Sequence, residues 1–190
     1  MRSQLSLFDA PVSLPEGLRH GAELISRDQE SCLVEAMREL PFKEFEFQGF
    51  LGKRRVVSFG WKYDFNMREL RRSEEIPEFL LAVRERAACF AGVPPSSLQQ
   101  VLVTEYRPGA SIGWHRDKAV FDEVIGISLL SSCLLRFRRK SGAAWQRASL
   151  PLAPRSAYLL KGPARMEWEH SIPALAGLRY SITFRNFKEA

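Results

Sequence analysis

A His-x-Asp pair, His115 and Asp117, is followed much later in the chain by a single further histidine, His170. Two imidazoles and one carboxylate on one face of a metal ion leave the opposite coordination positions open. Non-heme Fe(II) oxygenases use this ligand set because a co-substrate and O2 need the open positions. Histidine is scarce, since only His20 remains, and we predict that the three side chains form a catalytic metal site. The alternative is that the histidines are unrelated surface or core residues.

Two arginines, Arg179 and Arg185, follow the distal histidine on the predicted last strand. Their even spacing gives them equal parity, so both are expected to face one interior. A buried guanidinium needs an anion, because an unpaired buried charge is costly. Two inward arginines beside a metal predict a bound dicarboxylate held by bidentate contacts. Pairing with acidic side chains of neighbouring strands is the alternative.

The elements that must position these residues fall into two parts. Residues 27–40 and about 76–90 have helical patterns, which end at Pro41 and at Gly92 with Pro94. Eight short β-rich runs follow without intervening helices, at 101–106, 111–115, 124–130, 133–138, 148–152, 156–160, 167–172 and 179–184. This order predicts an α+β, mainly β fold, in which an antiparallel sandwich or barrel is braced on one outer face by the two N-terminal helices.

Length and composition set further bounds. A chain of 190 residues fits one domain and is long enough to bury a core. No stretch approaches the ~20 apolar residues of a membrane span, and the N-terminus does not have the pattern of a signal peptide. Cys32, Cys89 and Cys133 are scattered, which favours free thiols in a reducing cytoplasm over a disulfide framework. We expect a cytoplasmic protein, and nothing in the sequence demands more than a monomer.

Four segments resemble the AlkB family of Fe(II)/2-oxoglutarate dioxygenases: Tyr-Arg-Pro-Gly at 106–109, Trp-His-Arg-Asp-Lys at 114–118, Gly-Pro-Ala-Arg-Met-Glu-Trp-Glu-His at 162–170 and Arg-Tyr-Ser-Ile-Thr-Phe-Arg at 179–185. The last is the most specific, and the resemblance is close over 101–187 and looser over 42–100. It implies a double-stranded β-helix (jelly roll) core over 101–187 and a substrate-recognition lid over 42–70, within one domain of residues 21–190. It also implies Fe(II) as the cofactor, with 2-oxoglutarate and O2 as co-substrates.

The resemblance also implies roles for the residues around the metal. Arg179 would pair with the far carboxylate of 2-oxoglutarate, Arg185 would lie near its metal-chelating end, and Tyr106 would hydrogen-bond to it. Thr104 and Ser181 stand where bacterial members often carry asparagine for co-substrate binding. Both residues keep hydrogen-bonding capacity but are shorter than asparagine.

The activity that the resemblance implies is oxidative demethylation of N-alkylated bases, which is DNA repair by direct reversal. Hydroxylation of the alkyl carbon, coupled to decarboxylation of 2-oxoglutarate, leaves an N-hydroxymethyl group that falls apart to formaldehyde and the free base. The base must be flipped out, which is easiest in single-stranded DNA or RNA. Ala119 stands where some members read the base with an acidic group, so the same chemistry on a protein, tRNA or small molecule is an alternative. A metal-free jelly-roll binding module is another.

Residues 52–65 interleave aromatic and basic side chains and resemble the nucleotide-recognition lid of that family. Bases stack on aromatic faces and arginines hold phosphates. A hairpin with core aromatics is the alternative, which we favour for Phe59. The predicted substrate-binding residues are Arg54, Arg55, Trp61, Tyr63 and Phe65.

The charge balance is compatible with a nucleic-acid partner. The net charge is +6, and 21 of the 28 basic residues are arginine. Such a surplus permits a polyanionic partner without requiring one. The basic cluster at 136–140 either follows a phosphate backbone or is a solvated strand edge.

Residues 1–20 are broken by Pro11, Pro15 and Gly17, and are expected to form a flexible arm. Within the arm, residues 4–8 resemble the QL(S/D)LF pentapeptide by which bacterial replication and repair proteins dock on the sliding clamp. Packing of the arm over the core of its own domain is the alternative. The predicted clamp-binding residues are Gln4, Leu5, Leu7 and Phe8.

Overall fold

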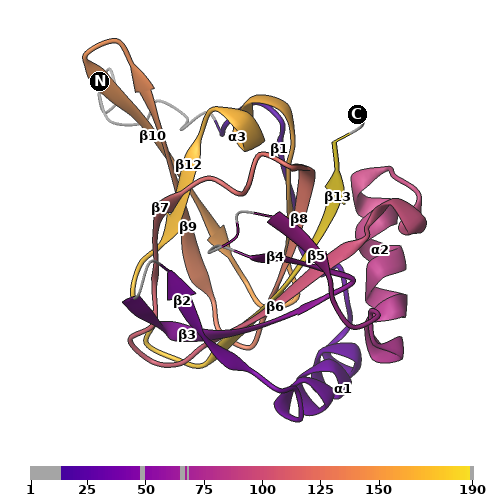
Figure 1. The fold of residues 1–190 in the computed structure, drawn as a ribbon. Coiled ribbons are helices and arrows are strands. Elements are labelled where there is room, and N and C mark those ends of the chain that lie inside the picture. The colour runs from indigo at the N-terminus through magenta and orange to yellow at the C-terminus, as the bar shows by residue number, and fades with distance from the viewer. Residues whose placement is uncertain (1–13, 48–49, 65–66, 68, 189–190) are drawn as a thin grey trace, which may run out of the picture.

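Two β-sheets face each other, and two of the three helices lie against the outside of the larger sheet (Figure 1). This arrangement is that of a computed structural model, which describes residues 14–47, 50–64, 67 and 69–188. The helices are α1 (Arg27–Arg38), α2 (Leu81–Ala91) and the short α3 (Gly162–Met166), with 3-10 turns at Glu78–Leu80 and Pro95–Ser97. None of the helices in these residues is long and apolar enough to cross a membrane.

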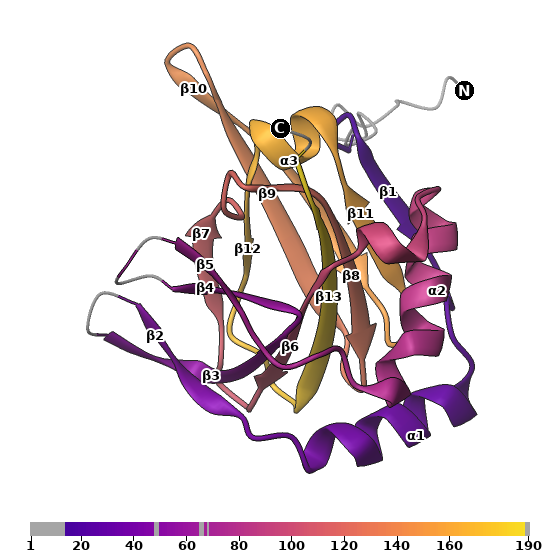
Figure 2. The same ribbon diagram turned by 45° about the vertical axis from the view of Figure 1, so that its right-hand side comes forward.

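The strands make an antiparallel jelly roll. They are β1 (Leu18–Gly21), β2 (Lys43–Phe47), β3 (Phe50–Phe59), β4 (Trp61–Asp64), β5 (Glu69–Arg72), β6 (Gln100–Tyr106), β7 (Ile112–His115), β8 (Phe121–Leu129), β9 (Cys133–Ser141), β10 (Ala144–Leu152), β11 (Ala157–Leu160), β12 (Glu169–Ile172) and β13 (Arg179–Phe187). The larger sheet has the order β1-β11-β8-β13-β6-β3-β2, and the smaller has the order β10-β9-β12-β7. Strands β4 and β5 pair separately, close to β3 (Figure 2).

Alternation along β13 divides the interior into two layers. Tyr180, Ile182 and Phe184 point toward the helices and join a core that includes Leu33 of α1 and Val83 of α2. The intervening residues of β13 point toward the smaller sheet, because successive side chains of a strand face opposite ways. A second core lies between the sheets and contains Leu135, Phe137, Leu150 and Leu152. The polar residues of β13 therefore face an interior that is only partly filled by apolar side chains.

The predicted fold class is confirmed, and each of the eight predicted runs overlaps a strand. Helix α2 begins later than predicted, because its first turn is the 3-10 segment Glu78–Leu80 after Pro77. The predicted strand at 167–172 starts at Glu169, because α3 precedes it.

The boundary of the predicted arm needs a correction. Strand β1 pairs antiparallel with β11, with Leu18 opposite Leu160 and Gly21 opposite Ala157. Residues 18–20, which were expected to be flexible, are therefore part of the larger sheet. The hypothesis that residues 4–8 bind a clamp lies outside the described residues.

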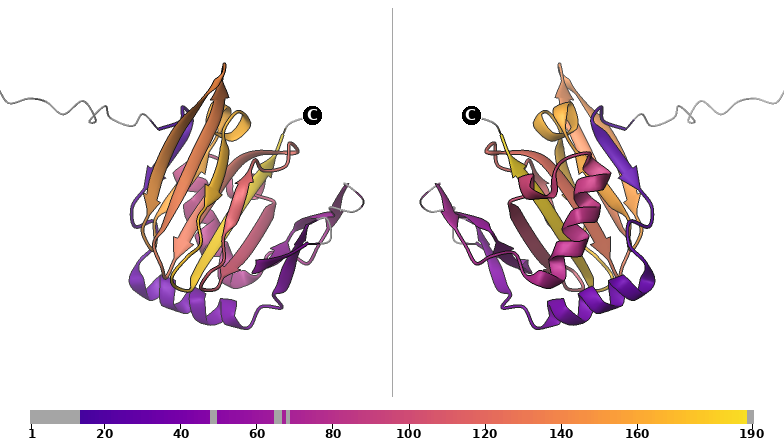
Figure 3. Two further views of the ribbon diagram at one scale, coloured as in Figure 1. Left: turned by 90° about the vertical axis from the view of Figure 1, so that its left-hand side faces the viewer. Right: turned by 90° about the vertical axis from the view of Figure 1, so that its right-hand side faces the viewer.

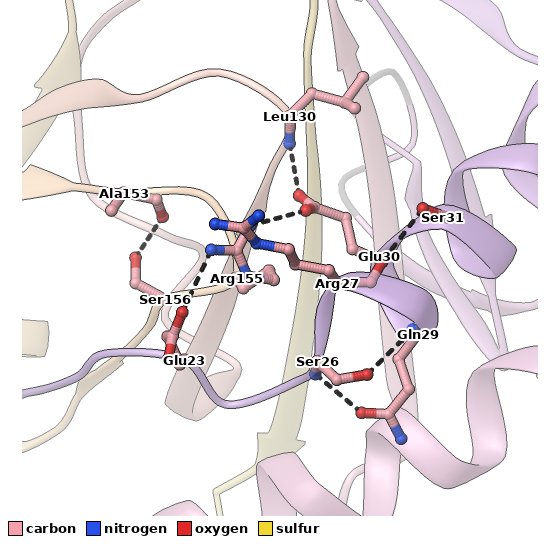
Figure 4. Close-up of polar contacts among 10 residues, drawn as sticks. All are labelled: Glu23, Ser26, Arg27, Gln29, Glu30, Ser31, Leu130, Ala153, Arg155 and Ser156. Carbon is pink, nitrogen blue, oxygen red and sulfur yellow. Dashed lines mark hydrogen bonds and ion pairs between the residues drawn. The ribbon is translucent and has the colours of Figure 1, made fainter.

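A buried carboxylate of α1 ties this helix to two turns of the jelly roll (Figure 4). Glu30 accepts hydrogen bonds from the backbone N–H of Leu130 at 2.8 Å and from Arg155 Nη1 at 3.0 Å. Leu130 and Arg155 both have positive φ angles, 68° and 66°, which non-glycine residues adopt at a cost of roughly 1–2 kcal/mol. The contacts from Glu30 stabilise both turns in this conformation. Ser26 and Gln29 form a capping box that fixes the start of the helix.

We predict that Glu30→Ala lowers the free energy of unfolding by about 1–3 kcal/mol, because it leaves the N–H of Leu130 without its acceptor. Urea denaturation measures the change. Glu35→Ala, at an exposed position of the same helix, is the matched control and should stay within about 0.5 kcal/mol of the unmodified protein. Equal stabilities of the two variants would contradict this account.

Candidate metal centre and cavity

Strand pairing in the smaller sheet brings the two predicted histidine ligands together. His170 of β12 lies opposite His115 of β7, with ring centroids 4.2 Å apart. Asp117 follows β7, and its Oδ2 lies 3.7 Å from His170 Nε2. His115 Nδ1 lies 2.9 Å from the carbonyl oxygen of Gly113. A proton on Nδ1 donates to that carbonyl and leaves His115 Nε2 free to bind a metal.

Burial and local charge put the three groups in the protonation states that metal ligands need. Burial lowers the pKa of His170 to about 3, with a further contribution from His115. Burial also lowers the pKa of His115. Burial alone would raise the pKa of Asp117, but Arg185 and then the histidines hold it well below its usual value. Two neutral imidazoles beside an ionised carboxylate are suited to bind a cation.

The carboxylate of Asp117 is shared with an arginine. Arg185 donates from Nη2 to Asp117 Oδ1 at 2.8 Å and from Nη1 to Gln100 Oε1 at 2.8 Å. No three His, Cys, Asp or Glu side chains in the described part of the chain are already arranged as a metal-binding group. The donor types and protonation states nevertheless fit Fe(II). Metal binding thus requires adjustment of side chains at positions that are already adjacent.

Arg179 is fully buried and lacks an acidic partner. Its Nε donates to Ser128 Oγ at 3.0 Å, whereas Nη1 and Nη2 have no hydrogen-bond partner among the described residues. The guanidinium carbon lies 5.0 Å from the centre of the Tyr106 ring. A buried guanidinium with two unused donors has the geometry and charge to pair with a carboxylate. The alternative of pairing with a neighbouring Asp or Glu therefore does not hold for Arg179.

A cavity of about 870 Å³ lies between the sheets and takes in the metal residues. The predicted co-substrate residues Tyr106, Thr104 and Ser181 line it, together with Arg185. They come from β6 and β13, which pair with Tyr106 opposite Arg179 and Thr104 opposite Ser181. The structure thus brings the predicted metal residues and four of the five predicted co-substrate residues around one space. Arg179 is not among the lining residues, and its guanidinium lies against the ring of Tyr106, which lines the cavity.

The same cavity extends to the predicted lid. Arg54 of β3, which lies opposite Tyr106 of β6, and Tyr63 of β4 both line the cavity. The guanidinium carbon of Arg54 lies 3.9 Å from the centre of the Phe45 ring. Burial lowers the pKa of Arg54, as expected for a cation drawn into the protein interior. Phe65 lies outside the described residues.

Two predicted substrate residues lie elsewhere. Arg55 points to the other side of β3, where Nε and Nη2 each donate to Glu105 at 2.8 Å. The Trp61 ring packs edge-on against Phe187 at 5.6 Å, with Arg72 above it at 4.7 Å, and it does not line the cavity. The predicted substrate contacts of Arg55 and Trp61 are corrected accordingly. Strand alternation places Arg55, next to the inward Arg54, on the opposite face.

Two features of the site were missed from the sequence. Arg165 of α3 donates from Nη2 to the carbonyls of Lys118 and Phe121, which holds the loop between β7 and β8. The Tyr158 side chain occupies the space beside Gly126, where a Cβ atom would come within 2.3 Å of the ring. The spacing of residues in a single sequence does not reveal such contacts between strands. For Arg165, its place in the segment 162–170 was the available signal.

Comparison with known proteins agrees with the fold and the site. A sequence model of the 2OG-Fe(II) oxygenase superfamily matches residues 24–185. The structure is similar to OsALKBH1, with a TM-score of 0.69 and 17% identity over 92% of this chain and 98% of that one. It is also similar to a Pseudomonas putida prolyl-4-hydroxylase, with a TM-score of 0.61 and 14% identity over 92% and 94% of the chains. At these identities the structural matches concern the fold.

Curated relatives narrow the class further. An Arabidopsis thaliana protein named "Alkylated DNA repair protein ALKBH8 homolog" is 32% identical over 193 residues, which cover 89% of this chain and 54% of that protein. Mouse "tRNA (carboxymethyluridine(34)-5-O)-methyltransferase ALKBH8" is 28% identical over 167 residues, 84% of this chain and 24% of that protein. This chain therefore spans between a quarter and about half of these relatives.

The fold, the His-Asp-His cluster and the inward arginines define a jelly-roll oxygenase. The chain belongs to the 2OG-Fe(II) oxygenase superfamily, and within it to the AlkB-like 2-oxoglutarate-dependent dioxygenases. Enzymes of this superfamily use Fe(II), 2-oxoglutarate and O2.

We predict that Arg179→Met raises the free energy of unfolding without ligand by about 1–4 kcal/mol, because it removes an uncompensated buried charge. The same variant should lose the increase in Tm that 2-oxoglutarate with Mn(II) gives the unmodified protein. Differential scanning calorimetry measures both effects.

Arg165→Met is the control, since it removes a buried guanidinium whose bonds to two carbonyls are made. It should lower Tm. A lower Tm for Arg179→Met as well would mean that its charge is already satisfied without ligand.

Proposed function

We propose that the protein oxidatively demethylates N-alkylated bases of single-stranded DNA, and so repairs alkylation damage by direct reversal. The cavity of about 870 Å³ carries this proposal, because it extends from the metal residues to the lid strands β3 and β4. A five-carbon diacid occupies only part of such a space. The remaining wall includes Phe45, Arg54, Lys62 and Tyr63. Aromatic and basic side chains together suit a flipped-out base and its phosphate.

His115, Asp117 and His170 would hold Fe(II), and they are the proposed catalytic residues. The bound iron, with 2-oxoglutarate and O2, supplies the oxidation of a C–H bond on the N-linked alkyl group. Arg185 keeps Asp117 ionised, which preserves its charge for the metal. Arg165, through its bonds to backbone carbonyls, holds the loop in which Asp117 lies.

The co-substrate would bind against β6 and β13. The unused Nη1 and Nη2 donors of Arg179 suit its far carboxylate. The Tyr106 hydroxyl, Thr104 and Ser181 line the cavity nearby and provide further hydrogen bonds. With the diacid in place, the buried charge of Arg179 is compensated and water is displaced from the reacting end of the cavity.

Substrate contacts are proposed for Arg54 and Tyr63, and for Phe65, which lies outside the described residues. Arg54 belongs to strand β3 of the predicted lid and lies opposite Tyr106, a predicted co-substrate residue, in the β3–β6 ladder. It therefore lies next to the proposed co-substrate position. Its stack on Phe45 fixes the plane of the guanidinium. A guanidinium held in this way offers planar donors to a base edge or a phosphate.

The names of the relatives support a nucleic-acid substrate, and they leave DNA and RNA as the two candidates. The Arabidopsis relative is named for alkylated DNA repair, which favours DNA. The mouse relative is named for tRNA, which makes RNA the second candidate. A protein or small-molecule substrate for the same chemistry is the remaining alternative.

We predict that an N-methylated single-stranded DNA oligonucleotide, incubated with Fe(II), 2-oxoglutarate and O2, loses the mass of one methylene per lesion. Formaldehyde and succinate should appear in equal amounts. His170→Ala should reduce turnover at least ~100-fold, and should lose the visible absorption band that Fe(II) with 2-oxoglutarate gives anaerobically. Mass spectrometry and anaerobic titration are the measurements.

His20→Ala is the matched control, because His20 is exposed on β1, and it should keep full turnover. The same sequence as RNA, run in parallel, decides between the two strands. If the unmodified protein releases succinate but demethylates neither the DNA nor the RNA, the proposed substrate is wrong, whereas the oxygenase activity is supported.

We also propose that Gln4, Leu5, Leu7 and Phe8 dock on a bacterial sliding clamp. The support is the pentapeptide pattern in the sequence. The full chain is expected to bind the clamp in surface plasmon resonance, and Gln4→Ala with Phe8→Ala is expected to abolish binding. Ser6→Asp preserves the pattern and should bind as well as the unmodified chain. Unchanged binding of the double variant would rule the clamp hypothesis out.

A further inference from the structure

The outer face of the smaller sheet, opposite the cavity, carries a distinct set of side chains. Strands β9 and β10 form a long hairpin whose tip projects beyond the other strands (Figures 1 and 3). In its ladder Lys140 lies opposite Trp145, and Arg138 lies opposite Arg147. The next pair of the ladder, Phe137 opposite Ala148, is buried in the core between the sheets. Alternation therefore places these basic and aromatic residues on the outside.

Indole and guanidinium groups alternate across this face. The guanidinium carbon of Arg138 lies 4.6 Å from the centres of both the Trp114 and the Trp145 rings. Arg136 lies 5.1 Å from the Trp114 ring. Trp145 is 45% exposed although it is a large apolar side chain. The stack runs from the hairpin to β7, which is the edge strand on the other side of the sheet from β10.

Most of the charge on this face is not neutralised. Arg138 pairs with Glu169 at 2.6 Å. Within the described part of the chain, Arg136, Lys140 and Arg147 form no ion pair with a carboxylate. Arg136 donates from Nε to Ser171 Oγ at 3.2 Å. The face thus combines excess positive charge with an exposed indole plane.

We propose that this face binds single-stranded nucleic acid and leads it to the cavity. We name it the Trp-Arg platform, and its residues are Trp114, Arg136, Arg138, Lys140, Trp145 and Arg147. Exposed cations neutralise phosphates, and aromatic faces stack bases of any sequence. An acidic peptide would satisfy the cations but would not use the indole plane. The proposal rests on the proposed function for its substrate class.

The geometry of the sheet suits an extended strand. Outward residues along β9 repeat every ~6.8 Å, which is comparable to the distance between successive phosphates of an extended strand. Trp114 belongs to the platform and also lines the cavity. It directly precedes His115. A strand lying on the platform would therefore reach the cavity wall at Trp114, where a base could turn inward.

Fluorescence anisotropy with a fluorescein-labelled, unmodified single-stranded oligonucleotide tests the platform without any turnover. Lys140→Gln with Arg147→Gln should reduce the slope of log affinity against log salt by about 1.4. Trp145→Ala should weaken binding roughly five- to a hundredfold. Arg27→Gln with Arg38→Gln, at exposed positions of α1, changes the net charge equally and should leave the slope unchanged. All variants should keep the unfolding transition of the unmodified protein.

A second readout does not depend on variants. Photocrosslinking of an oligonucleotide that contains 5-bromouracil should place the crosslink on the tryptic peptide 141–147, which contains Trp145. Crosslinks confined to the lid, equal salt slopes for the two double variants, or no binding by the unmodified protein would each overturn the proposal. A change of self-association in Trp145→Ala without loss of oligonucleotide binding would make the face an interface between copies, and would also overturn it.

The two proposals fail separately. A lesion in a trinucleotide should be turned over equally by the platform double variant and the unmodified protein, whereas KM for a long oligonucleotide should rise in the variant. If the protein binds oligonucleotides through the platform but does not demethylate them, the proposed reaction is wrong and the platform proposal stands. Demethylation of long and short substrates with equal KM by both proteins refutes the platform and keeps the reaction.

Discussion

The register of β12 against β7 is the constraint on which the site depends. His170 stands opposite His115 because these strands pair in one register, and β9 fixes β12 from its other side with Phe137 opposite His170. A shift by one residue would turn an imidazole to the outer face, since side chains alternate along a strand. Phe137 is fully buried between the sheets. Apolar packing around Phe137 therefore sets the position of the metal residues.

The interior around these residues holds more positive than negative charge. Arg54, Arg165 and Arg185 lie near the buried carboxylate of Asp117, and Arg179 lies close by against Tyr106. Burial lowers the pKa of Arg54 and Arg165, which shows that the cations are held against a desolvation cost. An anionic co-substrate relieves this imbalance. Co-substrate bound at these arginines would therefore stabilise the protein, as is common for sites that are strained without ligand.

The sequence predicted the position of a residue where that position depends on the local pattern of a single strand. The equal parity of Arg179 and Arg185, the strand runs after Gln100 and the His-x-Asp pair are local patterns. The structure places Arg185 and the His-x-Asp pair around one cavity, and Arg179 lies against the ring of Tyr106, which lines that cavity. The roles of Arg54 and Arg55 could not be separated in this way. Which of the two faces inward depends on the pairing of β3 with β6, distant in sequence. The contact of Tyr158 with Gly126 and the pairing of β1 with β11 likewise depend on long-range packing.

The two faces of the smaller sheet give the proposed functions a physical connection. Trp114 and His115 are neighbours in β7, as are Glu169 and His170 in β12, and in each pair one residue belongs to the outer face and the other to the site. Flipping a base costs a few kcal/mol. Stacking and phosphate contacts on a rigid sheet can offset that cost, because they hold the strand before the base turns inward. If the outer face binds the strand, the cavity needs to bind only the damaged base and the co-substrate.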